Sequence, residues 1–303
     1  MQETKPLIES DISIGILSYQ RTDLLLKTIF DLTSINAYVD LIIVNNNEGF
    51  CIEDEIRQVI KHCKNINLIY IYDKINYGVA IGRRKIIDAC ITDYIIMLDD
   101  DVSIPDINKV VATTLDEFNS DSQVKGIAFN IKEYNTKNHN RYEIPHKNKK
   151  INMDARFFTY LMIGAGHALH VPSVKRVGNY PDDFGMYGFE EVDVSFRLIN
   201  AGYKIVFNPH CLVEHKKSPD GRFSNQMVNK LAFVNRTKMA KRYFSLPNFL
   251  VCYVVRSAFF LGKTKNFLVF LSASQEIFSD KKKQRFSSVF YNYVKSVRGF
   301  IWW

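Results

Sequence analysis

The sequence predicts an α/β fold followed by a mostly helical, basic extension. The first hundred residues alternate short β-branched runs with helix-like segments, an order typical of a sheet covered by helices. Two runs, 41–44 and 94–98, are apolar throughout, as parallel strands buried on both faces are. Charge separates the two parts: residues 216–303 hold 17 Lys or Arg and 3 Asp or Glu, whereas the whole chain has a net charge of +8.

Four strands and three helices are predicted before residue 100, in the order βαβαβαβ. The strands are predicted over 12–17, 41–44, 68–72 and 94–98, and the helices over 23–33, 52–63 and 79–90. Polar residues follow three of these strands: Ser18-Tyr19-Gln20-Arg21, Asn45-Asn46-Asn47 and Asp99-Asp100-Asp101. Because ligands of such sheets bind at the carboxyl ends of the strands, we expect these residues to line one crevice.

The later part of the chain gives fewer elements. Residues 132–150 are rich in Asn, Lys and His without periodicity, which predicts a mobile surface loop. An apolar stretch over 157–171, a helix over 191–200 and a strand over 203–207 are predicted to follow. We therefore expect one α/β domain over residues 1–220 and a helical, basic and aromatic region over 221–303.

Composition limits the class of protein. With 303 residues, 47% of them hydrophobic, the chain can bury the core of one large or two moderate domains. Its five scattered cysteines contain no C-x-x-C pair, which suits a reducing cytosol. Residues 1–11 have no apolar region typical of a signal peptide, and no stretch reaches the roughly 18 apolar residues that span a bilayer. A cytoplasmic location is expected.

The aspartate triplet at the end of an apolar strand is the first candidate site. Adjacent carboxylates repel one another, and burying them unpaired is costly. In a strand, Asp99 and Asp101 face the same side while Asp100 faces the other. The pair can therefore hold a divalent cation, and oxygen ligands favour Mg²⁺ or Mn²⁺. The alternative is a charged turn that closes an edge strand.

Two further segments carry candidate binding groups. Residues 76–84 form a glycine-containing entry into a helix, which can bring backbone groups and an arginine close to phosphate. Residues 188–197 place carboxylates at a helix start, with Arg197 one turn after Asp193. The alternative for the second segment is an acidic N-terminus that only complements the helix dipole.

In their order and spacing, these motifs resemble those of the family 2 glycosyltransferases over residues 12–215. Residues 14–21 look like the family's first strand and its P-T-Y-N-R element, with Leu17, Ser18 and Gln20 departing from it. The other similar motifs are N-x-G-x-x-x-x-R at 76–83, D-x-D at 99–101, the glycine-containing stretch at 164–167, E-D-x-D at 190–193 and E-H-K at 214–216.

The resemblance implies a GT-A type fold, a Rossmann-like mixed sheet flanked by helices. It also implies an inverting transfer from a nucleotide-diphosphate sugar to a hydroxyl of a glycan or lipid-linked acceptor, using Mn²⁺ or Mg²⁺, in bacterial-type polysaccharide or glycolipid assembly. A UDP-sugar is favoured as donor. Asn45 departs from the family, since relatives carry there an aspartate that accepts the uracil N3 proton.

The resemblance assigns roles to individual residues. Glu191 is the expected catalytic base, with Glu190 as the second candidate. The donor site is expected to comprise Ser18, Tyr19, Arg21, Asn45, Asn76, Gly78, Arg83 and Asp99. The acceptor site is expected to comprise Gly166, His167, Asp182, Asp183, Asp193 and Arg197. The metal ligands are expected to be Asp99, Asp101 and His215.

The basic tail leaves several partners open. A positive tail with interleaved aromatic residues can follow a phosphate backbone, so a nucleic-acid-binding protein is the less favoured alternative function. The tail carries no RNP-like, helix-turn-helix or zinc motif, and nucleic acid is therefore not expected as a partner. Alternating aromatic and basic residues suit anionic lipid headgroups, which predicts a peripheral protein at the inner face of the cell membrane. A packed subdomain or a contact in a homo-oligomer is the alternative. A further alternative is a non-catalytic relative that binds a nucleotide sugar or glycan, because Asn45 and Glu191 both stand where the family usually has an aspartate. The intact Asp99 and Asp101 argue against it.

Overall fold

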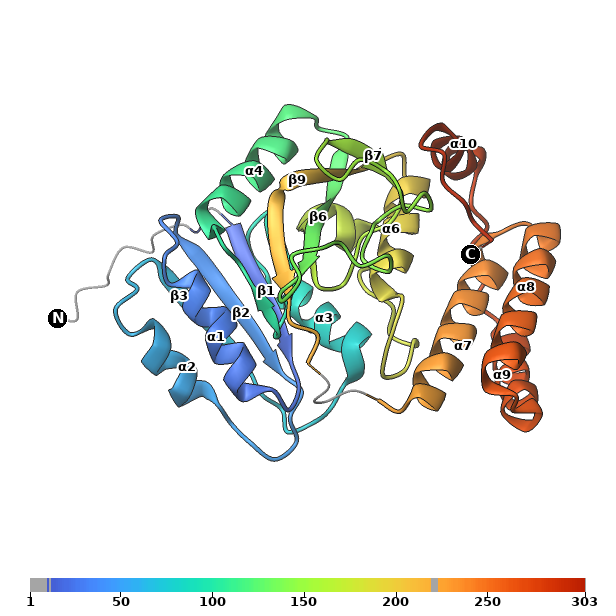
Figure 1. Cartoon of the computed structure of the whole chain (residues 1–303), viewed down its shortest axis with the longest axis horizontal. Coiled ribbons are helices and arrows are strands. Elements are labelled where there is room, and N and C mark those ends of the chain that lie inside the picture. The colour runs from blue at the N-terminus through green and yellow to red at the C-terminus, as the bar shows by residue number, and fades with distance from the viewer. Residues whose placement is uncertain (1–9, 11, 219–222, 303) are drawn as a thin grey trace.

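The computed structural model describes residues 10, 12–218 and 223–302. The segment predicted not to be a signal peptide therefore lies outside the described residues, except for Ser10. The predicted domain boundary between residues 220 and 221 also lies outside them. Figure 1 shows the sheet with its helices at the left and centre and four further helices at the right.

The described strands form one mixed sheet in the order β3-β2-β1-β4-β8-β6-β9-β5, with β7 paired to β9. Strands β1 to β4 run parallel to one another where they pair, whereas β8 is antiparallel to both β4 and β6. The strands are β1 (Ile12–Ser18), β2 (Val39–Asn45), β3 (Ile66–Ile71), β4 (Tyr94–Asp99), β5 (Val102–Ser103), β6 (Val124–Glu133), β7 (Phe157–Thr159), β8 (Gly166–His170) and β9 (Lys204–His215).

Helices cover both faces of the sheet. Apolar residues of α1, α2 and α4 pack on one face, and those of α3, α5 and α6 pack on the other. This arrangement confirms the predicted mixed sheet flanked by helices. The helices are α1 (Thr22–Leu32), α2 (Glu53–Ile60), α3 (Gly78–Ala89), α4 (Ile107–Ser120), α5 (Val171–Arg176), α6 (Glu190–Asn200), α7 (Asn225–Tyr243), α8 (Leu246–Thr264), α9 (Phe267–Ser279) and α10 (Ser288–Ser296).

The register of the central strands brings their polar ends together. In the parallel ladder Ser18 of β1 lies opposite Asn45 of β2, and Leu17 lies opposite Asp99 of β4. All seven residues of β2 are buried, as the apolar run over 41–44 within it predicts. The expected meeting of three polar strand ends at one edge of the sheet is confirmed.

The predicted helical extension is present as α7, α8, α9 and α10. It shares one hydrophobic cluster with the α6 side of the sheet. Phe196 of α6 lies with its ring centroid 5.1 Å from that of Phe290 in α10, and Phe244, at the end of α7, lies 6.2 Å from Phe196. The extension is therefore packed on the α/β part through an aromatic contact.

Two predictions about the later chain need correction. After β6 ends at Glu133, residues 134–150 form no helix or strand, but Glu143, Ile144 and His146 are buried, so the segment is not a surface loop throughout. His146 is fixed by a hydrogen bond of 2.9 Å between its Nε2 and the carbonyl of Val297. Strand β9 continues to His215, well beyond the predicted end at residue 207, because its pairing with β6 resumes after a register shift.

None of the helices in the described part of the chain has the length and apolar character needed to cross a bilayer. All five cysteines are free, and three of them are buried.

Candidate active site

The acidic end of β4 forms a cluster with the end of β9. Ligand atoms of Asp99, Asp101 and His215 all lie within 4.8 Å of one another. The short strand β5 creates this meeting, because Val102, the residue after the triplet, pairs directly with His215. Arg21, which precedes α1, places its Nη1 2.7 Å from Asp101 Oδ2. The structure thus brings together the three residues predicted as metal ligands.

Strand β4 ends at Asp99, so Asp100 and Asp101 lie in the following turn and not, as expected, in a strand. Asp100 Oδ1 lies 3.3 Å from the Arg21 Nη1 that also contacts Asp101. Asp100 Oδ2 accepts hydrogen bonds from Ser18 Oγ at 3.0 Å and from the Tyr19 backbone N–H at 3.2 Å. Burial raises the pKa of Asp100 to about 7, although the positive charge of Arg21 opposes the rise. Ser18 and Tyr19, predicted in the donor site, therefore hold the turn that follows β1 against β4.

The cluster fits a divalent cation. Among the described residues, no group donates a hydrogen bond of normal geometry to the buried Oδ1 of Asp101, whose neighbour His215 Nε2 lies at 3.2 Å. His215 Nδ1 lies 2.5 Å from Glu143 Oε1, and a carboxylate behind the imidazole leaves Nε2 available as a metal ligand. Carboxylate oxygens and an imidazole nitrogen are a suitable donor set.

The pKa shifts of His215 and Asp101 also indicate that this cluster favours a positive charge. Burial lowers the pKa of His215, but the carboxylates of Asp101 and Glu143 outweigh burial and raise it to about 10. Burial raises the pKa of Asp101, but the positive charges of the adjacent His215 and Arg21 outweigh burial and lower it overall. The raised pKa means that His215 carries a proton, and this positive charge lies where a bound cation would lie. Sequence reasoning missed Glu143, and the one signal was an isolated acidic residue within a segment rich in Lys and Asn.

Arg83 connects the acidic cluster to the start of α6. Its Nη1 donates to Glu190 Oε1 at 2.7 Å, and its Nη2 donates to Asp99 Oδ1 at 2.8 Å and to the Gly164 carbonyl at 2.9 Å. Its relative exposure is 3%, and a Cβ added to Gly164 would lie only 3.0 Å from its Nη2. Arg83, predicted to bind the donor, holds the candidate metal ligand and a candidate base in one network.

The two candidate bases have different surroundings. Glu190 is buried against Arg83, whereas Glu191 is half-buried. Burial, followed by the negative charge of Glu190, raises the pKa of Glu191 to about 8. Phe189, just before α6, has a left-handed backbone with φ 72°, which sets the direction of the two side chains. Glu191 is therefore poised to gain and lose a proton near neutral pH.

The remaining residues predicted in the donor site, Asn45, Asn76 and Gly78, make hydrogen bonds or close contacts within the protein. Asn45 donates through Nδ2 to the Phe50 carbonyl and to Tyr70 Oη, at 2.7 and 2.8 Å. Asn76 Oδ1 accepts from the Gly78 N–H at 3.0 Å. Gly78 has φ +73°, and a Cβ there would lie 2.7 Å from Met186 Cα. These residues shape the loops at the strand ends around the cluster.

Four residues predicted in the acceptor site are buried: Gly166, His167, Asp193 and Arg197. His167 Nε2 lies 2.7 Å from Tyr180 Oη, and burial, with the charge of Arg83, lowers its pKa to about 3. Asp193 accepts a hydrogen bond of 2.7 Å from Arg197 Nε. Direct contact of these side chains with an acceptor would require rearrangement of this buried network.

The other two predicted acceptor residues contact the extension. Asp183 forms an ion pair with Arg242 of α7. Lys282, beyond α9, lies 3.1 Å from Asp182 and 3.0 Å from Asp183. Both aspartates therefore attach the loop before α6 to the C-terminal helices.

Helix α7 supplies two site-supporting residues that sequence reasoning missed. Asn235 is buried, and its Nδ2 lies 2.8, 3.1 and 3.0 Å from the carbonyl oxygens of Phe184, Tyr187 and Gly188. Tyr243 Oη donates to Asp193 Oδ1 at 2.6 Å. Asn235 thus holds the loop that leads directly into Glu190 and Glu191.

Asn235→Ala should lower the free energy of unfolding by about 1–3 kcal/mol, because buried carbonyls lose their donor. Urea denaturation measures the change. Asn229→Ala on the same helix is the matched control and should shift stability by less than about 0.5 kcal/mol. Equal effects of the two substitutions would show that Asn235 does not secure this loop.

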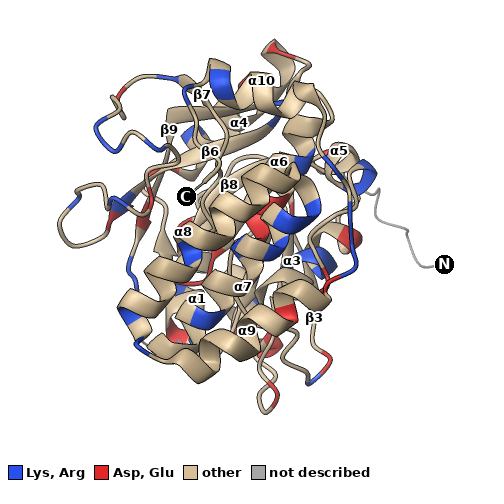
Figure 2. Ribbon diagram, turned by 90° about the vertical axis from the view of Figure 1, so that its right-hand side faces the viewer, with Lys and Arg blue, Asp and Glu red and all other residues tan. Residues whose placement is uncertain are grey.

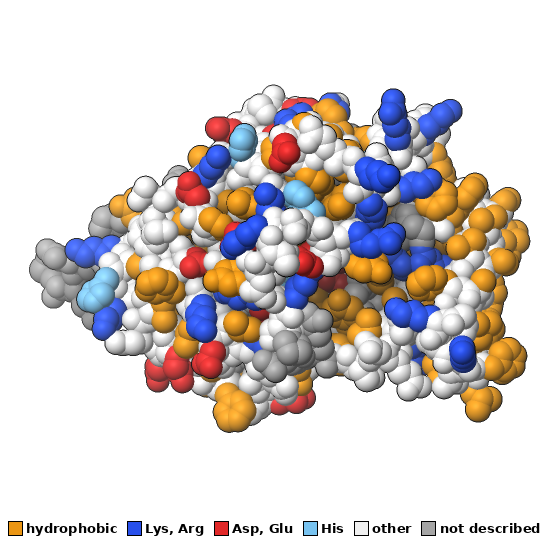
Figure 3. Space-filling model, in the orientation of Figure 1, with side chains coloured by type: hydrophobic (Ala, Val, Ile, Leu, Met, Phe, Trp, Pro, Cys, Tyr) orange, Lys and Arg blue, Asp and Glu red, His pale blue; other side chains and the backbone are white. Residues whose placement is uncertain are grey.

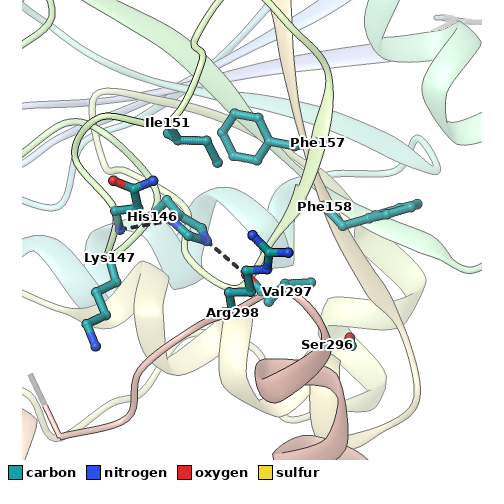
Figure 4. Close-up of a pocket in the computed structure, with 9 residues that line it drawn as sticks. His146, Lys147, Ile151, Phe157, Phe158, Ser296, Val297 and Arg298 are labelled. Atoms are coloured by element: carbon teal, nitrogen blue, oxygen red, sulfur yellow. Dashed lines mark hydrogen bonds between the residues drawn. The ribbon is translucent and has the colours of Figure 1, made fainter.

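A separate cavity of about 510 Å³ lies between the segment after β6 and the end of α10. Figure 4 shows Phe157 and Ile151 on one side and His146 hydrogen bonded to Val297 on the other. None of the residues predicted from the sequence as catalytic, donor, acceptor or metal residues lines this cavity. It therefore takes no part in the candidate site.

Comparison with known proteins gives consistent results. The model of the family described as Glycosyl transferase family 2 matches residues 13–177, more than half of the chain. An uncharacterized protein of Haemophilus influenzae is 34% identical over 174 residues, which cover 56% of this chain and 92% of that protein.

Two solved structures resemble the fold. The mannosyltransferase PcManGT of Pyrobaculum calidifontis, in complex with GDP-Man and Mn²⁺, has a TM-score of 0.59 at 12% identity and covers 89% of this chain and 75% of that one. S. aureus TarS 1-349, in complex with UDP-GlcNAc, has a TM-score of 0.60 at 10% identity, covering 88% and 80%. At such identities the likeness concerns the fold.

Proposed function

The chain belongs to glycosyl transferase family 2, and from this premise we propose that it is an inverting, metal-dependent, hexosyl-type enzyme. It moves a sugar from a nucleotide-diphosphate sugar to a hydroxyl of a glycan or lipid-linked acceptor. The observation that carries the proposal is the connected network of Asp99, Asp101 and His215 with Glu190, through the single side chain of Arg83.

Each part of the network has a chemical task. When bound by Asp99, Asp101 and His215, Mn²⁺ or Mg²⁺ offsets the charge that develops on the departing nucleoside diphosphate. Glu191 accepts the proton of the attacking acceptor hydroxyl. The attack on the face opposite the leaving group inverts the configuration at the anomeric carbon. Arg83 keeps Asp99 and Glu190 in fixed positions, which limits reorganisation during the reaction.

For the donor, we propose a UDP-sugar in the crevice at the ends of β1, β2 and β4. The resembling structures hold GDP-Man in one case and UDP-GlcNAc in the other. The Nδ2 of Asn45 is occupied by Phe50 and Tyr70, but its Oδ1 retains a lone pair besides the one used by the Asn47 N–H. That oxygen can accept the uracil N3 proton.

For the acceptor, we propose a step in bacterial-type polysaccharide or glycolipid assembly at the inner, cytoplasmic face of the cell membrane. The basic composition of residues 216–303 supports a location beside anionic lipids. Asp182, which is exposed, and Asp183, which is half-buried, remain the proposed acceptor-side residues at the junction of the loop and the extension.

Thermal unfolding with nucleotide sugars tests the donor site. The full chain is heated with UDP-, GDP-, dTDP- and CMP-sugars, each with and without Mn²⁺. Stabilisation by a UDP-sugar that requires Mn²⁺ is expected, of about 2.7 kcal/mol at a ligand concentration about 100 times Kd. The shift should vanish in Asp101→Asn. A folded protein that no nucleotide sugar stabilises would contradict the proposal and indicate a non-catalytic relative.

A further inference from the structure

Helices α8 and α9 expose an unusual concentration of apolar side chains. They contribute ten of the 22 exposed large hydrophobic residues in the described part of the chain. We call these ten residues the α8–α9 face: Leu246, Leu250, Val251, Val254, Val255, Phe259, Phe267, Leu268, Leu271 and Phe278. On α8 they recur at intervals of one, three and four positions, which places them on one side of the helix.

The opposite sides of the same helices are firmly packed. Phe249, Cys252 and Phe260 of α8 and Ala273 and Ile277 of α9 are buried in the main cluster. The ring of Phe260 lies 5.1 Å from that of Phe233 in α7. The α8–α9 face is therefore the outer surface of a well-packed layer, and Figure 1 shows helices α8 and α9 at the end of the molecule away from the sheet.

The α8–α9 face lacks charge, and basic residues flank it. Helix α8 contains only Arg256 and Lys263 as charged residues, and α9 contains only Glu276. The exposed residues Lys263 and Lys265 lie at the end of α8. After α9 come three more exposed basic residues, Lys281, Lys283 and Arg285, besides Lys282, which is paired with Asp182 and Asp183. Figure 2, which views this side, shows α8 and α9 largely tan. Figure 3 shows apolar side chains along the same edge.

Charge identifies the partner that this surface suits. A patch of this kind on a soluble protein marks a contact with a membrane or another protein. In a two-fold dimer of this chain the same basic flanks would meet one another, and like charges repel. An anionic lipid surface instead complements them. Trp302, 37% exposed, donates through Nε1 to Asn248 of α8 at 3.1 Å, and tryptophan favours the boundary between lipid and water.

We propose that the α8–α9 face docks onto the surface of an anionic membrane. The apolar side chains enter the boundary between headgroups and acyl chains, and the lysines at the ends of α8 and α9 contact lipid phosphates. This inference rests on the membrane location in the proposed function and names the surface of the protein that contacts the membrane. Docking does not require sugar transfer, so an experiment can contradict membrane docking without contradicting sugar transfer, and the reverse.

Flotation with vesicles tests the proposal on the full chain. The wild-type protein should float with vesicles of phosphatidylcholine and phosphatidylglycerol, and added salt should weaken the binding. Leu250→Glu combined with Val254→Glu changes side chains that are 48% and 64% exposed, so folding should persist. Partitioning should weaken by at least about tenfold, because two apolar side chains no longer enter the lipid.

The matched control is Phe30→Glu combined with Ile91→Glu, at 68% and 84% exposure on other surfaces. It should float like the wild type.

Lys263→Gln combined with Lys265→Gln should weaken binding to the anionic vesicles by several-fold and leave weak binding to pure phosphatidylcholine unchanged.

Three outcomes would overturn docking. The wild type, shown to be folded, could remain unbound to anionic vesicles. The variant with Leu250→Glu and Val254→Glu could float as well as the wild type. Light scattering could show a wild-type dimer that this variant converts to a monomer, without flotation of either, which would assign the α8–α9 face to a second copy.

Discussion

Glu191→Gln should lower kcat for sugar transfer by about 10²- to 10⁴-fold, the usual contribution of a positioned general base. The amide has nearly the same shape as the carboxylate but cannot accept the hydroxyl proton. Because burial, followed by the charge of Glu190, disfavours ionised Glu191, a neutral amide avoids the free-energy cost that the raised pKa gives this carboxyl group at neutral pH. The free energy of unfolding should therefore be unchanged or higher. Steady-state kinetics and urea denaturation measure the two effects.

Glu190→Gln is the comparison that separates the two acidic residues. It leaves the buried guanidinium of Arg83 without one of its two carboxylates, so stability should fall by about 3–5 kcal/mol. A Glu191→Gln enzyme with near wild-type kcat would remove Glu191 as base and make Glu190 the candidate.

The pH profile adds an independent measurement. With a pKa near 8, Glu191 is mostly protonated below that pH and inactive as a base. The rate should rise with pH through this region, and a cation held by Asp99 and Asp101 should move the midpoint lower. Glu191→Gln should abolish the rise.

Asp101→Asn should abolish the Mn²⁺ dependence of donor binding and lower kcat/KM by about 10³-fold, which corresponds to several kcal/mol of lost charge stabilisation. Asp101 has the least exposed side chain of the three candidate ligands, and it touches both His215 and Arg21. Calorimetric titration with Mn²⁺ measures the loss directly.

Asp100→Asn is the matched control within the same triplet. Its Oδ2 accepts hydrogen bonds from Ser18 and Tyr19, and its Oδ1 lies 3.3 Å from Arg21. An amide oxygen can still accept the hydrogen bonds from Ser18 and Tyr19. Mn²⁺ affinity should remain within about tenfold of wild type. Equal losses from both substitutions would contradict the assignment of Asp101 as a ligand and of Asp100 as a structural residue.

The sequence was informative where the interactions are local. Apolar runs predicted β1, β2 and β4, and the polar residues after them were expected to meet because parallel strands end at one edge. The triplet was expected to alternate its side chains as a strand does, although β4 ends at Asp99 and the other two aspartates lie in the turn that follows. Each of these inferences depends on residues within a few positions of one another.

Partners distant in sequence could not be inferred in this way. Asp183 and Arg242 are 59 positions apart, and Asp182 and Lys282 are 100 apart. Position in a motif suggested a role in acceptor binding for both aspartates, whereas tertiary packing pairs them with the extension. Glu143 reaches His215 over 72 positions, and nothing near it in sequence marks that contact.

The hydrogen bonds from Asn235 to three carbonyls have a consequence for how the protein can be divided. A fragment ending near residue 220 would retain the sheet, Asp99, Asp101 and Glu191. It would lack the side chain that secures the approach to α6 and the aromatic residues that cover Phe196. Such a fragment is a poor unit for expression or for building chimeric enzymes. We expect the smallest exchangeable module to include α7 for Asn235 and α10 for Phe290, and a graft that changes the extension to alter the surroundings of Glu190 and Glu191.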